Sequence, residues 1–127
     1  MADVNRGNRP LSPHLTIYRW PITMLTSILV RVTGIGIAVA GLLVVWWFVA
    51  AATSPGYYGF VNGLITSWLG DLVMTAALWG IWYHAMMGLK HLIWDQVWLL
   101  EVEAATKLTW AAVAASVVLT ILTLLII

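Results

Sequence analysis

Three long runs of apolar residues, separated by short polar stretches, dominate the pattern of this chain. The runs cover residues 32–52, 64–89 and 108–127. Each is close to the about 20 residues that a helix needs to cross about 30 Å of hydrocarbon. The pattern therefore predicts an all-α membrane protein with three transmembrane helices, over roughly 30–52, 64–90 and 107–127.

The composition of the 127 residues points to the same class, because 62% are hydrophobic and only 9% are charged. A soluble domain of this length would need more polar surface. We expect residues 1–127 to form one domain. Three helices bury little polar surface by themselves, so this domain is expected to be part of a multi-subunit helix bundle within membrane lipid. The net charge of +1 offers no electrostatic reason for a nucleic-acid partner.

The basic residues indicate how the helices are oriented. They lie before or at the start of the first run and around the second connection, at Arg6, Arg9, Arg19, Arg31, Lys90 and Lys107. The first connection, 53–62, and the C-terminal run have none. By the positive-inside rule, the N-terminal segment 1–28 is cytoplasmic, and 53–62, with its Ser-Pro-Gly turn, is periplasmic. The N-terminus has the features of neither a signal peptide nor a transit sequence, which favours a bacterial inner membrane over a mitochondrial one.

A histidine inside the second run is the first candidate for chemistry. His84 lies within residues 72–89, which otherwise carry no charge, and the chain has no cysteine to hold a metal. Ionisable side chains within a membrane usually face a partner or a cofactor, and an imidazole in a helix bundle suits haem iron. A neutral histidine that only makes hydrogen bonds is the alternative. His91 lies two helical turns later, beyond Lys90, and is a weaker alternative ligand.

Ser27 and Arg31 form the second candidate site. They are four residues apart, so they share one face if the chain is helical from residue 26 onward. A hydroxyl and a guanidinium on one face can hold the carbonyl oxygen of a quinone, because arginine always donates and serine donates or accepts. In the alternative interpretation, Arg31 extends to the lipid headgroups and Ser27 bonds a backbone carbonyl.

Three strings of residues resemble the signatures of a known family. Residues 9–15 read RPLSPHL and residues 27–34 read SILVRVTG, which is similar to the N-terminal signature of the cytochrome b subunit of succinate dehydrogenase. Residues 84–95 read HAMMGLKHLIWD and resemble the second signature of that family. The resemblance implies one of two membrane anchors for a flavoprotein and an iron–sulfur subunit, which oxidise succinate and pass electrons to membrane quinone. The chemistry at succinate would then lie outside this chain.

The resemblance also implies roles for individual residues. His84 matches an axial ligand of haem b whose other ligand comes from the second anchor, while Ser27 and Arg31 match residues that line the ubiquinone site. Two positions depart from the family pattern, since Val30 replaces a histidine and Lys90 replaces an arginine. Val30 cannot form hydrogen bonds through its side chain. If the family histidine helps to hold a haem propionate or the quinone pocket, this chain is expected to use Arg31 or a partner residue instead, or to bind more weakly.

Two alternatives remain open at this point. The chain can be the anchor of a fumarate reductase that oxidises quinol, or a haem-free structural anchor in which the histidines only make hydrogen bonds. Haem content separates the structural anchor from the cytochrome, but it does not separate succinate oxidation from fumarate reduction.

Overall fold

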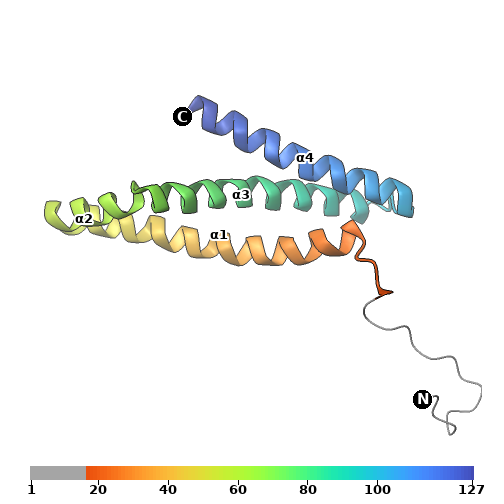
Figure 1. Cartoon of the computed structure of the whole chain (residues 1–127), viewed down its shortest axis with the longest axis horizontal. Helices are drawn as coiled ribbons and strands as arrows, with labels where there is room; N and C mark the ends of the chain where they lie inside the picture. The colour runs from red at the N-terminus through yellow and green to blue at the C-terminus, as the bar shows by residue number, and fades with distance from the viewer. Residues whose placement is uncertain (1–16) are drawn as a thin grey trace, which may run out of the picture.

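The computed structural model describes residues 17–127, which form four α-helices in the order shown in Figure 1. The helices are α1 (Ile22–Thr53), α2 (Pro55–Ile65), α3 (Trp68–Asp95) and α4 (Val102–Ile126). No strand occurs in this part of the chain. The predicted all-α class is therefore confirmed, and α1, α3 and α4 are each long and apolar enough to cross a membrane. The string at residues 9–15 and most of the segment 1–28 lie outside the described residues.

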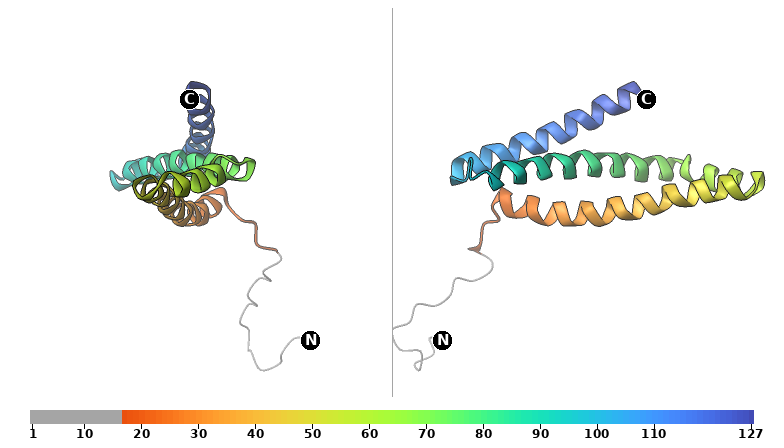
Figure 2. Two further views of the ribbon diagram at one scale, coloured as in Figure 1. Left: turned by 90° about the vertical axis from the view of Figure 1, so that its left-hand side faces the viewer. Right: turned by 180° about the vertical axis from the view of Figure 1, so that it is seen from behind.

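The three long helices lie side by side, with α3 in the middle (Figures 1 and 2). α1 and α3 run antiparallel along most of their length, and the short α2 lies at the end where α1 finishes. α4 packs on the other side of α3 near the α3–α4 loop and then diverges from it toward the C-terminus. The arrangement leaves most of each apolar helix uncovered, as expected where lipid and other subunits complete the bundle.

The helix ends differ from the ends of the apolar runs at several points. α1 begins at Ile22, before residue 30, where the expected membrane span starts. The Thr26 hydroxyl donates to the carbonyl oxygen of Ile22 at 3.0 Å, so no polar atom of this side chain is left unpaired. α3 begins at Trp68 rather than residue 64, because Ser67 caps it by accepting a hydrogen bond from the Gly70 N–H at 3.1 Å.

The first connection differs from the prediction, because most of 53–62 is helical rather than a loop. Ser54 is extended, with φ −164°, and its side chain accepts from the Tyr57 N–H at 3.3 Å. Pro55 then occupies the first helical position, where its missing N–H costs nothing. Two indole groups of α1 hold α2 in place: Trp46 Nε1 donates to Tyr57 Oη at 2.6 Å and Trp47 Nε1 to Asn62 Oδ1 at 3.1 Å.

Small and hydroxylated residues form the buried face of α4. They recur every three or four positions, at Ala105, Thr109, Ala112, Ser116 and Thr120. The three hydroxyls each donate to a carbonyl oxygen of their own helix, at 2.7 Å. The face that α4 presents to its neighbours is therefore compact and has no unpaired polar side chain, which allows close helix packing inside a membrane.

Tyr83 joins α3 to the start of α1. Its side chain is fully buried with Met87 and Ala112, and its hydroxyl donates to the backbone carbonyl of Thr26 at 3.0 Å. This carbonyl belongs to the first turns of α1, so the bond connects helices far apart in sequence. It fixes how α3 lies against the part of α1 that carries Ser27 and Arg31.

We expect Tyr83→Phe to destabilise the packing of α1 on α3 by about 0.5–1.5 kcal/mol, because one buried interhelical hydrogen bond is lost. The matched control is Tyr58→Phe, since Tyr58 packs on the Trp47 ring at 5.6 Å and its hydroxyl forms no hydrogen bond within residues 17–127. Thermal unfolding in detergent measures the difference. Equal unfolding temperatures for the two variants would contradict this role of the Tyr83 hydroxyl.

Candidate functional site

A polar recess opens between α1 and α3 at the end of the bundle where α1 begins. Its volume is about 440 Å³. Residues on one face of α1 and on the last turns of α3 line it: Thr23, Met24, Ser27, Ile28, Arg31, Lys90, His91 and Trp94. Ser27 and Arg31 thus share a face, as the four-residue spacing predicts, and both border the same space.

The hydroxyl of Ser27 differs from those of the neighbouring threonines. Thr26 and Thr33 donate to carbonyl oxygens of α1, at 3.0 and 2.8 Å. Ser27 Oγ makes no such bond within residues 17–127, although its side chain is only half-exposed. The alternative in which Ser27 simply bonds its own helix is therefore not what the structure shows, and the hydroxyl is available to a ligand in the recess.

The α3 side of the recess includes a residue that the sequence analysis missed. Trp94 packs edge-on against His91, with ring centroids 5.4 Å apart, and its indole Nε1 is buried without a hydrogen-bond partner in the described chain. Lys90 is 2% exposed, and its Nζ lies 4.4 Å from the centroid of the Trp94 ring. The spacing of Lys90 and Trp94, four residues apart on a helix, is the signal that could have indicated this pairing.

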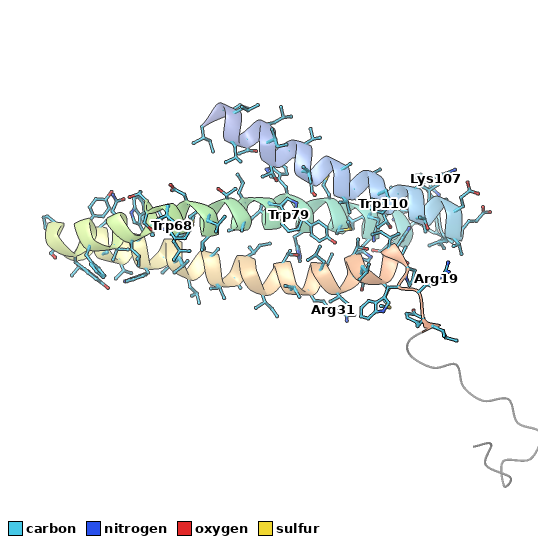
Figure 3. All side chains as sticks on the ribbon, in the orientation of Figure 1. Arg19, Arg31, Trp68, Trp79, Lys107 and Trp110 are labelled. Atoms are coloured by element: carbon cyan, nitrogen blue, oxygen red, sulfur yellow. The ribbon has the colours of Figure 1, made fainter. Side chains whose placement is uncertain are left out.

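The recess is basic. Arg31, Lys90 and His91 line it, and no acidic residue does. Asp95 forms no ion pair with Arg31 or Lys90, and the ion pair present within residues 17–127 joins Lys107 to Glu103 on the surface of α4 at 2.6 Å. Figure 3 shows Arg19, Arg31 and Lys107 at this end of the bundle and Trp68 toward the other end.

Val30, which replaces a histidine of the family pattern, does not line the recess. It packs against the buried cluster of Tyr83, Met87 and Ala112. In this chain position 30 therefore contributes to the apolar core between the helices. Any charge that a ligand meets in the recess comes from Arg31, Lys90 and His91.

His84 lies outside the polar recess, against α1. A Cβ atom added at Gly34 would lie 3.2 Å from His84 Cε1, so the absence of a side chain at Gly34 lets the imidazole approach the helix. The ring remains exposed on the surface of the chain. His91 is two turns away on α3, about 10 Å along the axis, so the two histidines cannot bind the same iron. Within residues 17–127 no group of three metal-ligating side chains occurs.

An apolar recess lies between α1 and α3 on the other side of His84, toward α2. Its volume is also about 440 Å³. Small and aliphatic side chains line it, among them Gly36, Ile37, Ala40, Ala77 and Gly80. His84, which touches Gly34, lines neither recess; along α3 it follows the residues that line the apolar recess and precedes those that line the basic one.

The sequence of the chain matches the family described as succinate dehydrogenase/fumarate reductase transmembrane subunit over residues 5–123. The chain belongs to this family. The succinate dehydrogenase cytochrome b556 subunit of Paracoccus denitrificans is 49% identical over 126 residues, which cover 99% of this chain and 97% of that protein. The protein of the same name from Rickettsia bellii is 35% identical over 116 residues, or 91% of this chain and 90% of that protein. The mitochondrial cytochrome b560 subunit of Sus scrofa is 41% identical over 98 residues, or 70% of this chain and 54% of that protein.

Membership confirms the resemblance that the signature strings indicate. The chain is a transmembrane subunit of the succinate dehydrogenase/fumarate reductase family, and its three long apolar helices agree with that description. The bacterial relatives are consistent with the predicted multi-pass location in an inner membrane. The roles of Ser27, Arg31, His84 and His91 remain predictions.

Proposed function

We propose that this chain is the cytochrome b anchor of a succinate dehydrogenase, holding haem b through His84 and forming part of the ubiquinone-reduction site through Ser27 and Arg31. The observation that carries the proposal is the position of the exposed His84 against Gly34 of α1, next along the helices to the basic recess that Ser27 and Arg31 line. Succinate oxidation belongs to a flavoprotein subunit, and an iron–sulfur subunit passes the electrons to the membrane. This chain takes no part in the chemistry at succinate.

The surroundings of His84 fit an amphiphilic haem. The imidazole offers a nitrogen ligand, and its exposed ring is open to a group held between this chain and another. Arg31 and Lys90, which line the basic recess nearby, suit the propionates of the haem. Because His91 lies about 10 Å from His84 along α3, too far to bind the same iron, we assign the other axial ligand to the second anchor. A bound haem b would supply reversible one-electron transfer.

The polar recess fits a quinone as substrate. Ser27 Oγ and the Arg31 guanidinium can both donate to a carbonyl oxygen, while Met24 and Ile28 give the same wall an apolar surface for the ring. Their role is to hold and polarise the quinone as negative charge develops on its oxygens. Reduction also consumes two protons, for which donors come partly from other subunits.

The basic end of the bundle is assigned to the cytoplasmic side of the membrane. Arg19, Arg31, Lys90 and Lys107 all lie at that end, and basic residues are enriched on the cytoplasmic side of bacterial membrane proteins. The N-terminus is then cytoplasmic, and α2 lies on the periplasmic side. In this orientation the polar recess lies where electrons and protons arrive from soluble subunits and cytoplasm.

The alternative within the family is a fumarate reductase anchor, which would use the same recess to oxidise quinol. The family description includes both enzymes. We favour succinate oxidation because the relatives that match over 90% or more of this chain carry the succinate dehydrogenase name.

We expect His84→Ala to remove the b-type haem signal from the assembled complex, because the iron loses a ligand that His91 is too distant to replace. His91→Ala is the matched control and should keep the signal. The measurement is a reduced-minus-oxidised visible spectrum of the complex purified with its partner subunits. A signal that survives in His84→Ala would assign the ligand to another residue, and its absence from the unaltered complex would favour the haem-free anchor.

We expect Arg31→Ala to lower the rate of quinone reduction about 10- to 100-fold, since hydrogen bonds to a charged donor contribute about 1.5–3 kcal/mol. Succinate oxidation by a soluble artificial acceptor should stay unchanged, because that reaction does not need the recess. Arg31→Lys keeps the charge without the planar fork and should show an intermediate loss. The ratio of the two activities checks this, and an unchanged ratio in Arg31→Ala would remove the residue from the site.

We expect Gly34→Ala to alter the haem signal without abolishing it. The added methyl group would approach His84 Cε1 to 3.2 Å, so the ring must move by a few tenths of an ångström. Gly41→Ala is the matched control, because a Cβ there meets nothing within 4 Å. Haem midpoint potential and the low-spin electron paramagnetic resonance spectrum are the readouts. If both variants match the unaltered complex, the Gly34 contact does not position His84.

A further inference from the structure

Two apolar recesses follow one another between α1 and α3, on the half of the bundle nearer to α2. The larger, of about 440 Å³, is the apolar recess described above. The smaller, of about 190 Å³, lies next to α2, and α1, α2 and α3 contribute to its lining through residues such as Trp46, Leu64 and Met74. Leu43 and Val73 line both recesses. The two recesses therefore adjoin and form one apolar groove, which we call the α2-side groove.

The length and depth of the α2-side groove match one leaflet of a membrane. Along α3 the groove extends from Leu69 to Gly80, which is about 17 Å at about 1.5 Å per residue. One leaflet contributes about 15 Å to a hydrocarbon thickness of about 30 Å. Gly80 lies about 15 Å before Lys90, the charged residue at the end of the apolar part of α3, so the groove ends near the middle of the membrane. The groove therefore lies in the leaflet on the α2 side.

The shape of the groove suits a flexible chain better than a helix. Small residues of both helices line it, at Gly36, Ala40, Ala76, Ala77 and Gly80. α1 and α3 are in contact beneath it, because a Cβ atom at Gly80 would lie 3.5 Å from Ile37 Cγ1. A helix with its side chains is about 10–12 Å wide, whereas the part of the groove next to α2 has a volume of only about 190 Å³. A hydrocarbon chain can follow the groove to that end, but a straight helix of another subunit cannot.

The α2-side groove and the polar recess lie on different sides of α1. Gly36 follows Ser27 by about two and a half helical turns, so the two residues lie on opposite sides of the helix. A quinone that binds at Ser27 therefore cannot extend its tail into the groove. No charged residue lines the groove, and the chain has no lysine or arginine between Arg31 and Lys90 to hold an anionic headgroup. The groove can thus recognise an apolar chain but not a charge.

We propose that the α2-side groove binds one acyl chain of a phospholipid, with the headgroup at the level of α2 and the terminal methyl group beside Gly80. Within a membrane the favourable free energy comes from van der Waals packing, because the chain fills a space that straight neighbouring helices would leave empty. The site depends neither on haem nor on quinone chemistry.

The test is photolabelling of the complex, purified with its partner subunits and reconstituted into phosphatidylcholine vesicles. A tracer phosphatidylcholine carries a diazirine at the terminal end of one acyl chain, and mass spectrometry of peptides locates the label. We expect the label to concentrate on residues 32–40 and 76–80, at the end of the groove near the middle of the membrane. A tracer with the diazirine near the carboxyl end of the chain should instead label residues 64–70, next to α2.

Two variants fill the groove and one serves as the control. Gly36→Leu adds a side chain without a clash inside the chain, because a Cβ atom at Gly36 meets nothing within 4 Å. It should lower the labelling of residues 76–80 about tenfold, since the leucine displaces on the order of ten van der Waals contacts between acyl chain and groove. Ala76→Leu, which fills the groove from α3, should lower the labelling of residues 32–40 similarly. Gly41→Leu is the matched control and should change neither, because Gly41 lines neither recess and a Cβ there also meets nothing within 4 Å.

Three results would overturn the proposal. Label spread evenly over all lipid-facing residues would indicate ordinary surrounding lipid. Loss of the groove label when ubiquinone is added at a small fraction of the phospholipid would assign the groove to a quinone tail. Absence of label from the groove of the unaltered complex would show that another subunit covers it. If the leucine variants do not assemble, the positions labelled by the two tracers in the unaltered complex, with and without ubiquinone, still decide between these results.

Discussion

A polar group inside a membrane has no water with which to form hydrogen bonds. This constraint decides where the polar side chains of the chain find their partners. The hydroxyls of Thr26, Thr33 and Thr109 donate to carbonyl oxygens of their own helices. The hydroxyl of Tyr83 reaches a carbonyl of the neighbouring helix. Polar groups that the chain pairs internally thus become part of the packing, and the groups left unpaired mark places where something else must bind.

Those unpaired groups gather along one seam, between the first half of α1 and the last turns of α3. Ser27 Oγ, Trp94 Nε1 and the ammonium of Lys90 have no hydrogen-bond partner in the part of the chain that the structure describes, and all three residues border one recess. The opposite end of the bundle shows the reverse, because the indoles of Trp46 and Trp47 are both paired across to α2. Unpaired polar groups therefore favour a ligand site at the end where α1 begins. The paired indoles at the other end have a structural role, because they hold α2 against α1.

The same seam explains why the chain depends on other subunits. α1, α3 and α4 lie in a row with α3 in the middle, and only α1 and α3 line the recess among the helices of residues 17–127. His84 approaches α1 at Gly34 yet stays exposed, which suits a group shared with a second anchor. Such a site lies at the interface between two subunits of a helix bundle. The other subunit is needed to exclude lipid from the site and to supply the remaining ligands.

Four properties follow from the amino-acid sequence without the fold: the membrane class, the three long helices, the common face of Ser27 and Arg31, and the family. These properties depend on the length of apolar runs, on helical periodicity and on signature strings, all of which are local. Three further properties depend on the tertiary structure: residues 55–65 are helical, Gly34 makes room for His84, and Lys90 and Trp94 line the same polar recess as Arg31. The rotation of α3 against α1 decides which side chains of the two helices meet. That rotation depends on interhelical contacts such as the hydrogen bond from the Tyr83 hydroxyl to the Thr26 carbonyl. The pattern of residues within one helix does not reveal such contacts.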